Sequence, residues 1–355
     1  MKETLAQSRF FKVEKLEAFI KTAFMAIDMS EQEAGIIAEL MADADLNGVD
    51  SHGIFRLPHY IRRLKTGGIN LHPEIKVERE KSGMALVNGD NGMGHLVMKY
   101  AADLAVQKAK SNGVAWVGTK YSNHAGPASL YAKIPLKDDM IGLYVAIGNA
   151  NHLPPWGGTE MLLSTNPIAI AVPAWEEAPV VLDMATTVSA YGKVKTAAQR
   201  GEEMPEGWMV DRQGKPLTDP NRAEEGFLLP IGGYKGYGLA LLLGLLAGTL
   251  NGAAMGKDVV DWNADDVSVT NTGQFIVAIS IESFAEIETF KRAVDGVVRS
   301  MQSSPTLPGF DKVQVPGEQS FAKKQERTAN GIPMHEKLFQ SLQNLASELK
   351  IEPLQ

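Results

Sequence analysis

One short stretch, from Asn47 to Tyr60, holds the residues with the clearest potential for chemistry. Its centre reads Asp50-Ser51-His52-Gly53, and Arg56 follows three residues after the glycine. A histidine can transfer a proton near neutral pH, and a guanidinium can hold a carboxylate through two parallel hydrogen bonds. The stretch therefore indicates a proton-transfer site for an acid. The alternative is that His52 caps a helix and that Arg56 is a solvated surface charge.

A second histidine follows an apolar run at Val114 to Val117. The sequence there is Tyr121-Ser122-Asn123-His124-Ala125-Gly126. Polar groups just beyond a strand often line the cleft of an open α/β sheet. His124 is a second candidate for proton transfer or substrate orientation, and the alternative is a hydrogen-bonded turn histidine. The other histidines form no helical i, i+4 pair and the chain has no cysteine, so no metal site is predicted.

Two further stretches could hold a nucleotide. Gly232 to Gly238 contains Lys235 and opens a predicted helix, so its backbone amides and the lysine could bind a phosphate. Asp183 ends an apolar run and could accept a hydrogen bond from a ribose hydroxyl. The alternatives are a flexible helix start and a helix cap. Gly89 to Gly94 has the wrong glycine order for a Rossmann fingerprint.

The elements that must position these residues begin with helices. Apolar residues at spacings of three and four predict a helix from Val13 to Phe24. Ser30 and Glu33 form a capping box for a second helix, which runs out at Asn47-Gly48. A third is expected at Tyr60 to Lys65, and a final amphipathic helix at Glu336 to Leu349.

From about residue 73 the pattern becomes strands interleaved with helices, which predicts an α/β domain. We expect a helical lobe from residues 1–72 with 304–355, and an α/β domain from residues 73–303. Residues 189–232 are long and weakly periodic, which indicates a functional excursion. The expected strands are Ala85–Asn88, Val114–Val117, Ile141–Ile147, Ile168–Val172, Val180–Leu182 and Phe275–Ile281, and the expected helices are His95–Ser111, Tyr237–Leu250 and Ala285–Gln302.

Composition excludes several classes of protein. The 355 residues include 35 basic and 42 acidic side chains, a net charge of -7, which argues against a nucleic-acid or anionic-membrane surface. The absence of cysteine excludes disulfides and thiolate sites. Met1 to Thr4 shows no start of a secretory signal, and Leu239 to Leu250 is too short to span a bilayer. We therefore expect a cytoplasmic protein.

Taken together and in order, the motifs resemble a known family, the type 2 malate/L-lactate dehydrogenases. That family is unrelated to the Rossmann-fold lactate and malate dehydrogenases, and it includes enzymes acting on ureidoglycolate, 2,3-diketogulonate, sulfolactate and cyclic imino acids. The resemblance is carried by Asp50-Ser51-His52-Gly53 with Arg56, Ser122-Asn123-His124, Trp156-Gly157-Gly158, Thr165-Asn166-Pro167, Asp183-Met184-Ala185-Thr186, Pro205-Glu206-Gly207-Trp208, Thr218-Asp219-Pro220, Gly233 to Leu239, Pro316-Gly317-Glu318 and Gly331-Ile332-Pro333.

The resemblance implies an NAD(P)-dependent reductase of a small 2-oxo acid, or dehydrogenase of the 2-hydroxy acid. It implies a non-Rossmann cofactor domain and a homodimer with its active site in a cleft between lobes. NAD is slightly favoured, because no basic pocket for a 2′-phosphate is legible. The implied catalytic residues are Ser51, His52, Arg56 and His124, and the implied cofactor contacts are Gly148, Leu182, Asp183, Met184, Lys235, Gly236, Pro316, Gly317 and Glu318.

The chain departs from the family pattern near the expected pocket. Ser164 stands where glycine is usual, and Asn149 to His152 is an uncommon version of its segment. The substrate therefore stays open, with a cyclic 2-imino acid as an alternative. A lyase or isomerase using His52 and His124 as an acid/base pair, and a non-catalytic binding module for a small acid, are the other hypotheses.

Overall fold

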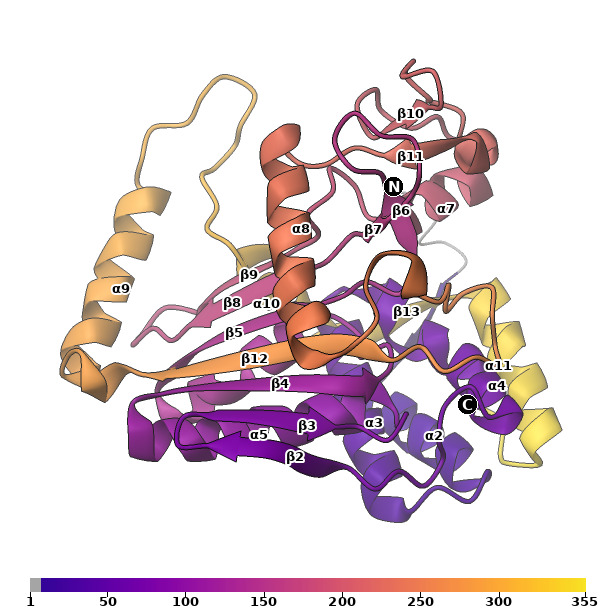
Figure 1. Cartoon of the computed structure of the whole chain (residues 1–355), viewed down its shortest axis with the longest axis horizontal. Helices are drawn as coiled ribbons and strands as arrows, with labels where there is room; N and C mark the ends of the chain where they lie inside the picture. Colours follow the sequence, from indigo (N-terminus) through magenta and orange to yellow (C-terminus); the bar gives the residue numbers. More distant parts are fainter. Residues whose placement is uncertain (1–7) are drawn as a thin grey trace.

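The computed structural model describes residues 8–355, except for the side chains of residues 8, 199 and 200. The expectation of no secretory signal rests on residues 1–4, which lie outside the described part. A seven-stranded sheet forms the centre of the molecule, and helices cover both of its faces (Figure 1). None of the described helices is both long enough and apolar enough to cross a membrane.

The sheet has the order β2-β3-β4-β12-β5-β8-β9. β3 and β4 run parallel, and the other neighbours run antiparallel. The mixed α/β fold class predicted from the sequence is confirmed, although the sheet is mostly antiparallel. The strands are β2 (Lys76–Lys81), β3 (Met84–Asn88), β4 (Val114–Ser122), β5 (Met140–Ala146), β8 (Ile168–Val172), β9 (Val180–Met184) and β12 (Thr272–Ser280).

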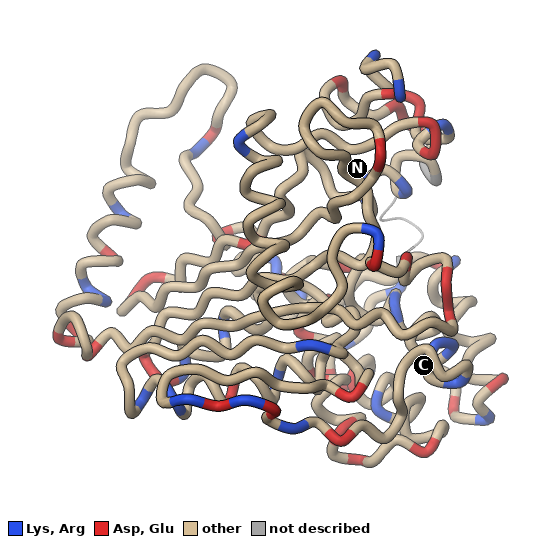
Figure 2. Tube along the Cα trace, viewed as in Figure 1, with Lys and Arg blue, Asp and Glu red and all other residues tan. Residues whose placement is uncertain are grey.

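The edge strand β2 was not predicted, because its sequence Lys-Val-Glu-Arg-Glu-Lys has almost no apolar residues. Pairing with β3 holds it in place. Basic and acidic residues alternate along this edge (Figure 2). Charged side chains on an edge strand discourage pairing with another chain.

The two faces of the sheet are covered by different helices. On β12, Ile276 and Ala278 pack on the face covered by α5 (Gly94–Asn112), whereas Phe275 and Val277 pack on the face covered by α8 (Tyr234–Ala247). Side chains of a strand alternate between faces, so this strand is buried on both sides. The short helix α6 (Ser129–Ala132) lies with α5.

A separate hydrophobic core joins the two ends of the described chain. The capping box is confirmed, because Glu33 N–H donates to Ser30 Oγ at the start of the second helix. The third helix ends at Gly67, whose φ of 83° is one that side-chain-bearing residues avoid. The helices around this core are α2 (Val13–Met25), α3 (Glu31–Leu46), α4 (Leu57–Thr66) and α11 (Glu336–Leu349).

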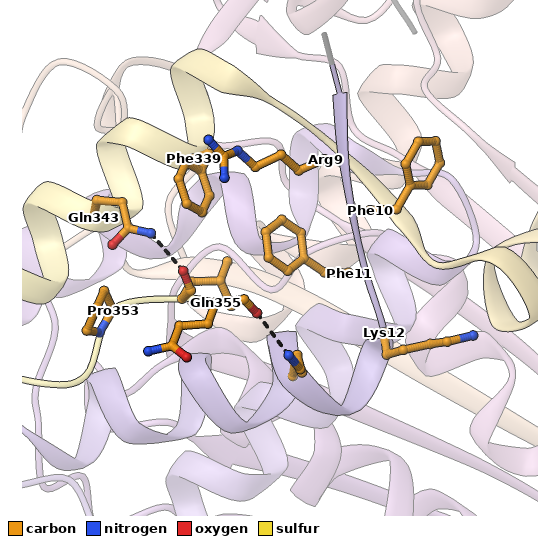
Figure 3. Close-up of a pocket in the computed structure, with 10 residues that line it drawn as sticks. Arg9, Phe10, Phe11, Lys12, Phe339, Gln343, Pro353 and Gln355 are labelled. Carbon is orange, nitrogen blue, oxygen red and sulfur yellow. Dashed lines mark hydrogen bonds between the residues drawn. The ribbon is translucent and has the colours of Figure 1, made fainter. Parts of the chain in front are cut away.

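The chain ends are bound to each other. β1 (Ser8–Phe11) pairs antiparallel with β13 (Ile332–His335). Phe11 stacks on Phe339, and the Arg9 guanidinium lies 4.1 Å from the centre of the Phe339 ring (Figure 3). Lys15 donates to the backbone oxygen of Gln355. The apolar faces of the terminal helices are therefore buried within the chain.

The excursion at residues 189–232 forms a small unit with its own core. It contains α7 (Tyr191–Arg200) and a hairpin of β10 (Met209–Asp211) and β11 (Gly226–Leu228). A second small pair joins β6 (Asn151–Leu153) to β7 (Leu163–Ser164).

After β12, the chain forms α9 (Ile287–Gln302), a long loop and α10 (Glu318–Asn330) (Figure 1). The helix α10 was not predicted, because its sequence is polar on most sides.

Candidate active site

The loop between α3 and α4 presents the first group of predicted catalytic residues. It consists of two short turns, Asp50–His52 and Ile54–Arg56, joined at Gly53. Ser51 is exposed and His52 is half-buried. Ser51 Oγ lies 2.7 Å from His52 Nδ1. This contact leaves Nε2 of His52 as the nitrogen that can exchange a proton with a ligand.

His124 follows β4 and lies beside His52. The two imidazole rings stack with their centres 5.4 Å apart. Tyr60, fully buried on α4, places its hydroxyl 2.5 Å from His124 Nδ1. The structure thus brings together two histidines that are 72 positions apart in the sequence. The sequence predicted both histidines, but not the role of Tyr60.

The surroundings of the two rings favour different protonation states. Tyr60 is buried and its hydroxyl has Nδ1 of His124 as its hydrogen-bond partner, so it donates there. Gly126 N–H points at the same nitrogen. Neutral His124 therefore carries its proton on Nε2. Ser51, by contrast, has a hydroxyl that can either donate to His52 or accept from it, which lets His52 gain a second proton.

Burial keeps both rings neutral in the ligand-free protein. Burial, and then the neighbouring Arg56 guanidinium, lower the pKa of His52 to about 4. Burial lowers the pKa of His124 well below its usual range, and the positive charges of His52 and Arg56 add to this effect. A negatively charged ligand next to Arg56 would cancel part of its effect and raise both pKa values.

Arg56 is held in place on one side of its guanidinium. Nε donates to the backbone oxygen of Ser51 over 2.9 Å, and Nη1 donates to Asn263 Oδ1 over 3.2 Å. Burial lowers the pKa of Arg56, but an arginine stays charged at neutral pH. An oriented guanidinium at the edge of a half-buried site is suited to a ligand carboxylate.

Trp262 completes the site and was missed by the sequence analysis. It is 1% exposed, and its ring stacks on His124 at 4.8 Å and on His59 at 4.0 Å. Its backbone N–H donates to Asn149 O. A tryptophan in an aperiodic loop gives no signal of its position, because the contacts that place it are more than 100 residues away in the sequence.

The predicted cofactor residues lie along a separate strip of backbone. A Cβ at Gly148 would overlap Ser164 Oγ, so only glycine fits there. Thr165 O accepts hydrogen bonds from the backbone and the hydroxyl of Thr186, just beyond β9. The backbone oxygen of Thr186 in turn accepts from Ile231 N–H. Ile231 lies just ahead of the N-terminus of α8, which carries Lys235 and Gly236. Lys235 is exposed in the first turn of that helix.

The other end of this strip is the contact between β9 and the segment before α10. Pro316 O accepts from Val181 N–H, and a Cβ at Gly317 would lie 3.0 Å from the Val181 backbone. Leu182, Asp183 and Met184 follow on the same strand. The structure therefore places all the predicted cofactor residues along one path from α10 to α8.

Two predicted carboxylates have partners within the protein. Asp183 is exposed at the end of β9, and Ser129 N–H donates to it over 2.8 Å. Glu318 accepts hydrogen bonds from Lys312, Gln302 and Val315 N–H. These bonds hold the Pro316–Glu318 turn in shape. They also leave Asp183 as the more accessible of the two carboxylates.

Residues 11–343 match the family model described as malate/L-lactate dehydrogenase. The chain belongs to this family. A malate/(S)-sulfolactate dehydrogenase from Methanothermus fervidus is 40% identical, with 92% of this chain and 94% of the relative aligned. A ureidoglycolate dehydrogenase (NAD(+)) from Escherichia coli K12 is 32% identical, with 93% of each chain aligned. The sulfolactate dehydrogenase structure from Methanocaldococcus jannaschii matches with a TM-score of 0.90 and 38% identity, covering 97% of this chain and 98% of that one.

The family resemblance read from the sequence is thereby confirmed, and so is the prediction of a dehydrogenase. In this dehydrogenase the histidine site meets the strip of predicted cofactor residues (the cofactor strip) at Asn149, through its hydrogen bond with Trp262. The Nδ2 atom of Asn149 is buried and has no hydrogen-bond partner among the described residues. A buried donor of this kind requires an acceptor, and the carboxamide of a nicotinamide is one. The residues present therefore fit the cofactor.

A cavity of about 340 Å³ is lined in part by Asn263, whose side chain accepts the hydrogen bond from Arg56. His152 and Tyr191 stack face to face at 4.1 Å in its wall, which brings the 189–232 unit up to the site. Within residues 8–355, no group of three or more acidic or histidine side chains is arranged to hold a metal ion.

Proposed function

We propose that this dehydrogenase transfers a hydride between a nicotinamide cofactor and a small 2-oxo acid, with the 2-hydroxy acid as the other partner. The observation that carries the proposal is the stacked pair His52 and His124 beside an oriented Arg56, next to the cofactor strip at Asn149. Such a constellation offers a proton, a hydrogen-bond donor and a carboxylate partner within one half-buried site.

The bound nicotinamide would supply or accept the hydride. Arg56 binds the substrate carboxylate and so fixes the carbonyl carbon in place. His124, protonated on Nε2, donates a hydrogen bond to the substrate oxygen. His52 gives a proton to that oxygen during reduction and takes it back during oxidation, while Ser51 stabilises the charged ring. General acid help of this kind contributes about 10² to 10⁴ in rate.

NAD is the cofactor we favour. The accessible Asp183 at the end of β9 is suited to a ribose hydroxyl, and its charge would repel the 2′-phosphate of NADP. The amides of the α8 N-terminus and Lys235 would hold the phosphates. The name of the Escherichia coli relative, which specifies NAD(+), supports the same choice.

The substrate class follows from the relatives. Their names specify malate, sulfolactate and ureidoglycolate, which are all small 2-hydroxy acids. A panel of 2-oxo acids and cyclic imines, each mixed with NADH and with NADPH, tests the proposal by the absorbance at about 340 nm, where reduced nicotinamide absorbs. Oxidation of NADH by a 2-oxo acid is the expected result. Turnover of a cyclic imine alone would favour the imino acid reductase.

The same panel distinguishes a dehydrogenase from a lyase or isomerase. Such an enzyme would change the acid without any loss of absorbance by the reduced cofactor. A binding module would leave both the acid and the cofactor unchanged. Product analysis by NMR on the same mixtures distinguishes these two outcomes.

We also propose a homodimer of two-lobed subunits, in the cytoplasm. The α8 helix is apolar on most sides, yet its Leu242 and, in the turn just after it, Leu250 are at least 60% exposed, and Leu245 and Leu246 of the helix are also exposed. A contiguous exposed apolar surface of this kind marks an interface. Light scattering is expected to give twice the chain mass of 38.4 kDa, and Leu246→Glu to shift it towards the single chain.

A further inference from the structure

Asp45 lies directly beneath the loop that carries Ser51 and His52. Its side chain sits at the C-terminal end of α3 and is 2% exposed. The backbone N–H of Ile54 donates to Asp45 Oδ2 over 2.8 Å. Gly53 packs against the same carboxyl group, because a Cβ there would overlap it. The junction between the two turns of the loop therefore rests on one buried carboxyl group.

Arg327 of α10 holds the same loop from another side. Its buried guanidinium donates to the backbone oxygen of Asp45 and to both carboxylate oxygens of Asp50. Asp50 is the first residue of the turn that ends at His52. A bidentate arginine–carboxylate pair fixes geometry as well as adding stability. Arg327 and Asp45 together therefore define the path of the backbone on both sides of His52.

We propose that Asp45 and Arg327 are positioning residues for His52, which set the place of its ring without touching substrate or cofactor. The proposal rests on the proposed function, in which His52 exchanges a proton with the substrate. Proton transfer requires a catalytic group within hydrogen-bond reach of the reacting atom. A displacement of about 1 Å from a change outside the reacting centre can cost about 10²-fold in rate.

The charge state of Asp45 is also expected to affect the position of the loop. Burial raises the pKa of Asp45 to about 8, and the nearby Asp50 adds to the rise, while the bond from Ile54 N–H and the charge of Arg327 oppose it. At pH 7 the group is therefore a neutral carboxyl. When it loses its proton, two carboxylates, Asp45 and Asp50, face the single guanidinium of Arg327. The loop is then expected to shift. The rate of oxidation, which deprotonation of His52 does not lower, is expected to fall as the pH rises past about 8.

Three variants in the full-length protein test the proposal. Asp45→Asn keeps an acceptor for Ile54 N–H but cannot ionise, whereas Asp45→Leu has a similar volume and no acceptor. Asp43→Asn is the matched control, because Asp43 lies on the same helix and pairs with Lys133 and Lys324 instead of the loop. For each variant, kcat, KM and the dissociation constant of the reduced cofactor are measured from pH 6 to about pH 10.

Asp45→Leu is expected to lose about 10- to 100-fold in kcat with unchanged cofactor affinity. Asp45→Asn is expected to keep kcat within about threefold at pH 7 and to lose the fall in activity above about pH 8. Asp43→Asn is expected to match the wild type in both respects. If Asp45→Leu does not fold, the pH profile of Asp45→Asn decides. An unchanged alkaline limb in Asp45→Asn, or wild-type kcat in Asp45→Leu, would overturn the proposal.

A wild type without turnover on any acid would contradict the proposed function and leave the positioning testable. The His52 ring signal in an NMR spectrum of the histidines reports its surroundings directly. Asp45→Leu is expected to change the chemical shift and the pKa of the His52 ring more than Asp43→Asn does. Equal spectra for the two variants would then contradict the positioning role.

Discussion

The histidine site and the cofactor strip are built in opposite ways. In the site, Tyr60 and Trp262 are fully buried and fix the ring of His124 through side-chain contacts, and His52 stacks on that ring. Along the strip, the contacts that define the path are made by backbone atoms, with glycine at the close approaches. Lys235 and Asp183, two of the three charged residues of the strip, are exposed.

This difference agrees with the role that we propose for each region. Proton transfer depends on the position and the pKa of individual atoms, so it needs buried and rigid side chains. A dinucleotide presents phosphates and riboses that many amide groups can bind, so backbone shape suffices. Substitutions in the histidine site should therefore change chemistry strongly, whereas substitution of an exposed side chain on the strip should change affinity weakly.

The largest effect is expected at the two histidines. His52→Asn keeps similar hydrogen bonding but cannot transfer a proton, so kcat should fall by about 10² or more. Cofactor affinity should survive, because the strip does not depend on this ring. Stopped-flow reduction rates and fluorescence titration measure the two quantities. His124→Asn is the control, and a greater loss in that variant would make His124 the proton donor.

The pH dependence of the wild type sharpens the same test. Reduction requires a protonated His52, so its rate should fall as the pH rises through the pKa of this ring, and oxidation should show the opposite limb. The pKa of about 4 belongs to the ligand-free protein, where burial and then the charge of Arg56 lower it. A bound carboxylate offsets that charge. The limb in kcat should therefore lie at higher pH than the limb in kcat/KM.

Arg56 should give the next largest effect. Charge-assisted hydrogen bonds contribute about 1.5 to 3 kcal/mol, so Arg56→Ala should cost about 10- to 150-fold in kcat/KM. Arg56→Lys should restore little activity, because a lysine cannot keep the bonds to Ser51 O and Asn263 while binding a carboxylate. Full activity in Arg56→Lys would place the carboxylate elsewhere.

The buried His95 is expected to make the free energy of unfolding depend on pH. This ring is fully buried, neither nitrogen has a partner among the described residues, and burial lowers its pKa to about 3. The folded protein therefore binds fewer protons than the unfolded chain below pH 6.5, and stability is lost as the pH falls. Between pH 7 and 4.5, wild type should lose about 2 to 3 kcal/mol more free energy of unfolding than His95→Leu. Free energies of unfolding are measured by urea titration at each pH. Equal losses of free energy in the two proteins would contradict this prediction.

The smallest effect is expected on the strip. Lys235→Ala should raise the dissociation constant of the reduced cofactor by only about 2- to 5-fold, because an exposed charge pair contributes little. Lys337→Ala is the matched control, since Lys337 is also exposed at the second position of a helix, α11. An unchanged dissociation constant would make Lys235 a surface lysine. A 100-fold rise would show that the strip depends on side chains after all.

The sequence predicted the elements that have a clear local signal. The helix at residues 13–24 lies where expected because its apolar residues recur at helical spacing, and the strand around Phe275 lies where expected because its residues are apolar and β-branched. The strand β2 and the helix α10 were missed, since both are polar. β2 is held by pairing with its neighbour β3, and α10 is held by a contact with a distant part of the chain. The site shows the same limit. Its histidines are recognisable as motifs, whereas Tyr60, Trp262 and Asp45 act through positions that only the fold defines.

The bond between Asp50 and Arg327 joins residues 277 positions apart, which has a consequence for synthesis of the protein. A ribosome completes the histidine loop long before it makes the helix that holds it. The contact between the loop and Arg327 can form only after nearly the whole chain has been made. The same holds for the pairing of β1 with β13. Contacts over such separations form slowly, because a long loop of chain has to close first. A growing chain is therefore expected to carry every catalytic residue for some time while it is still inactive.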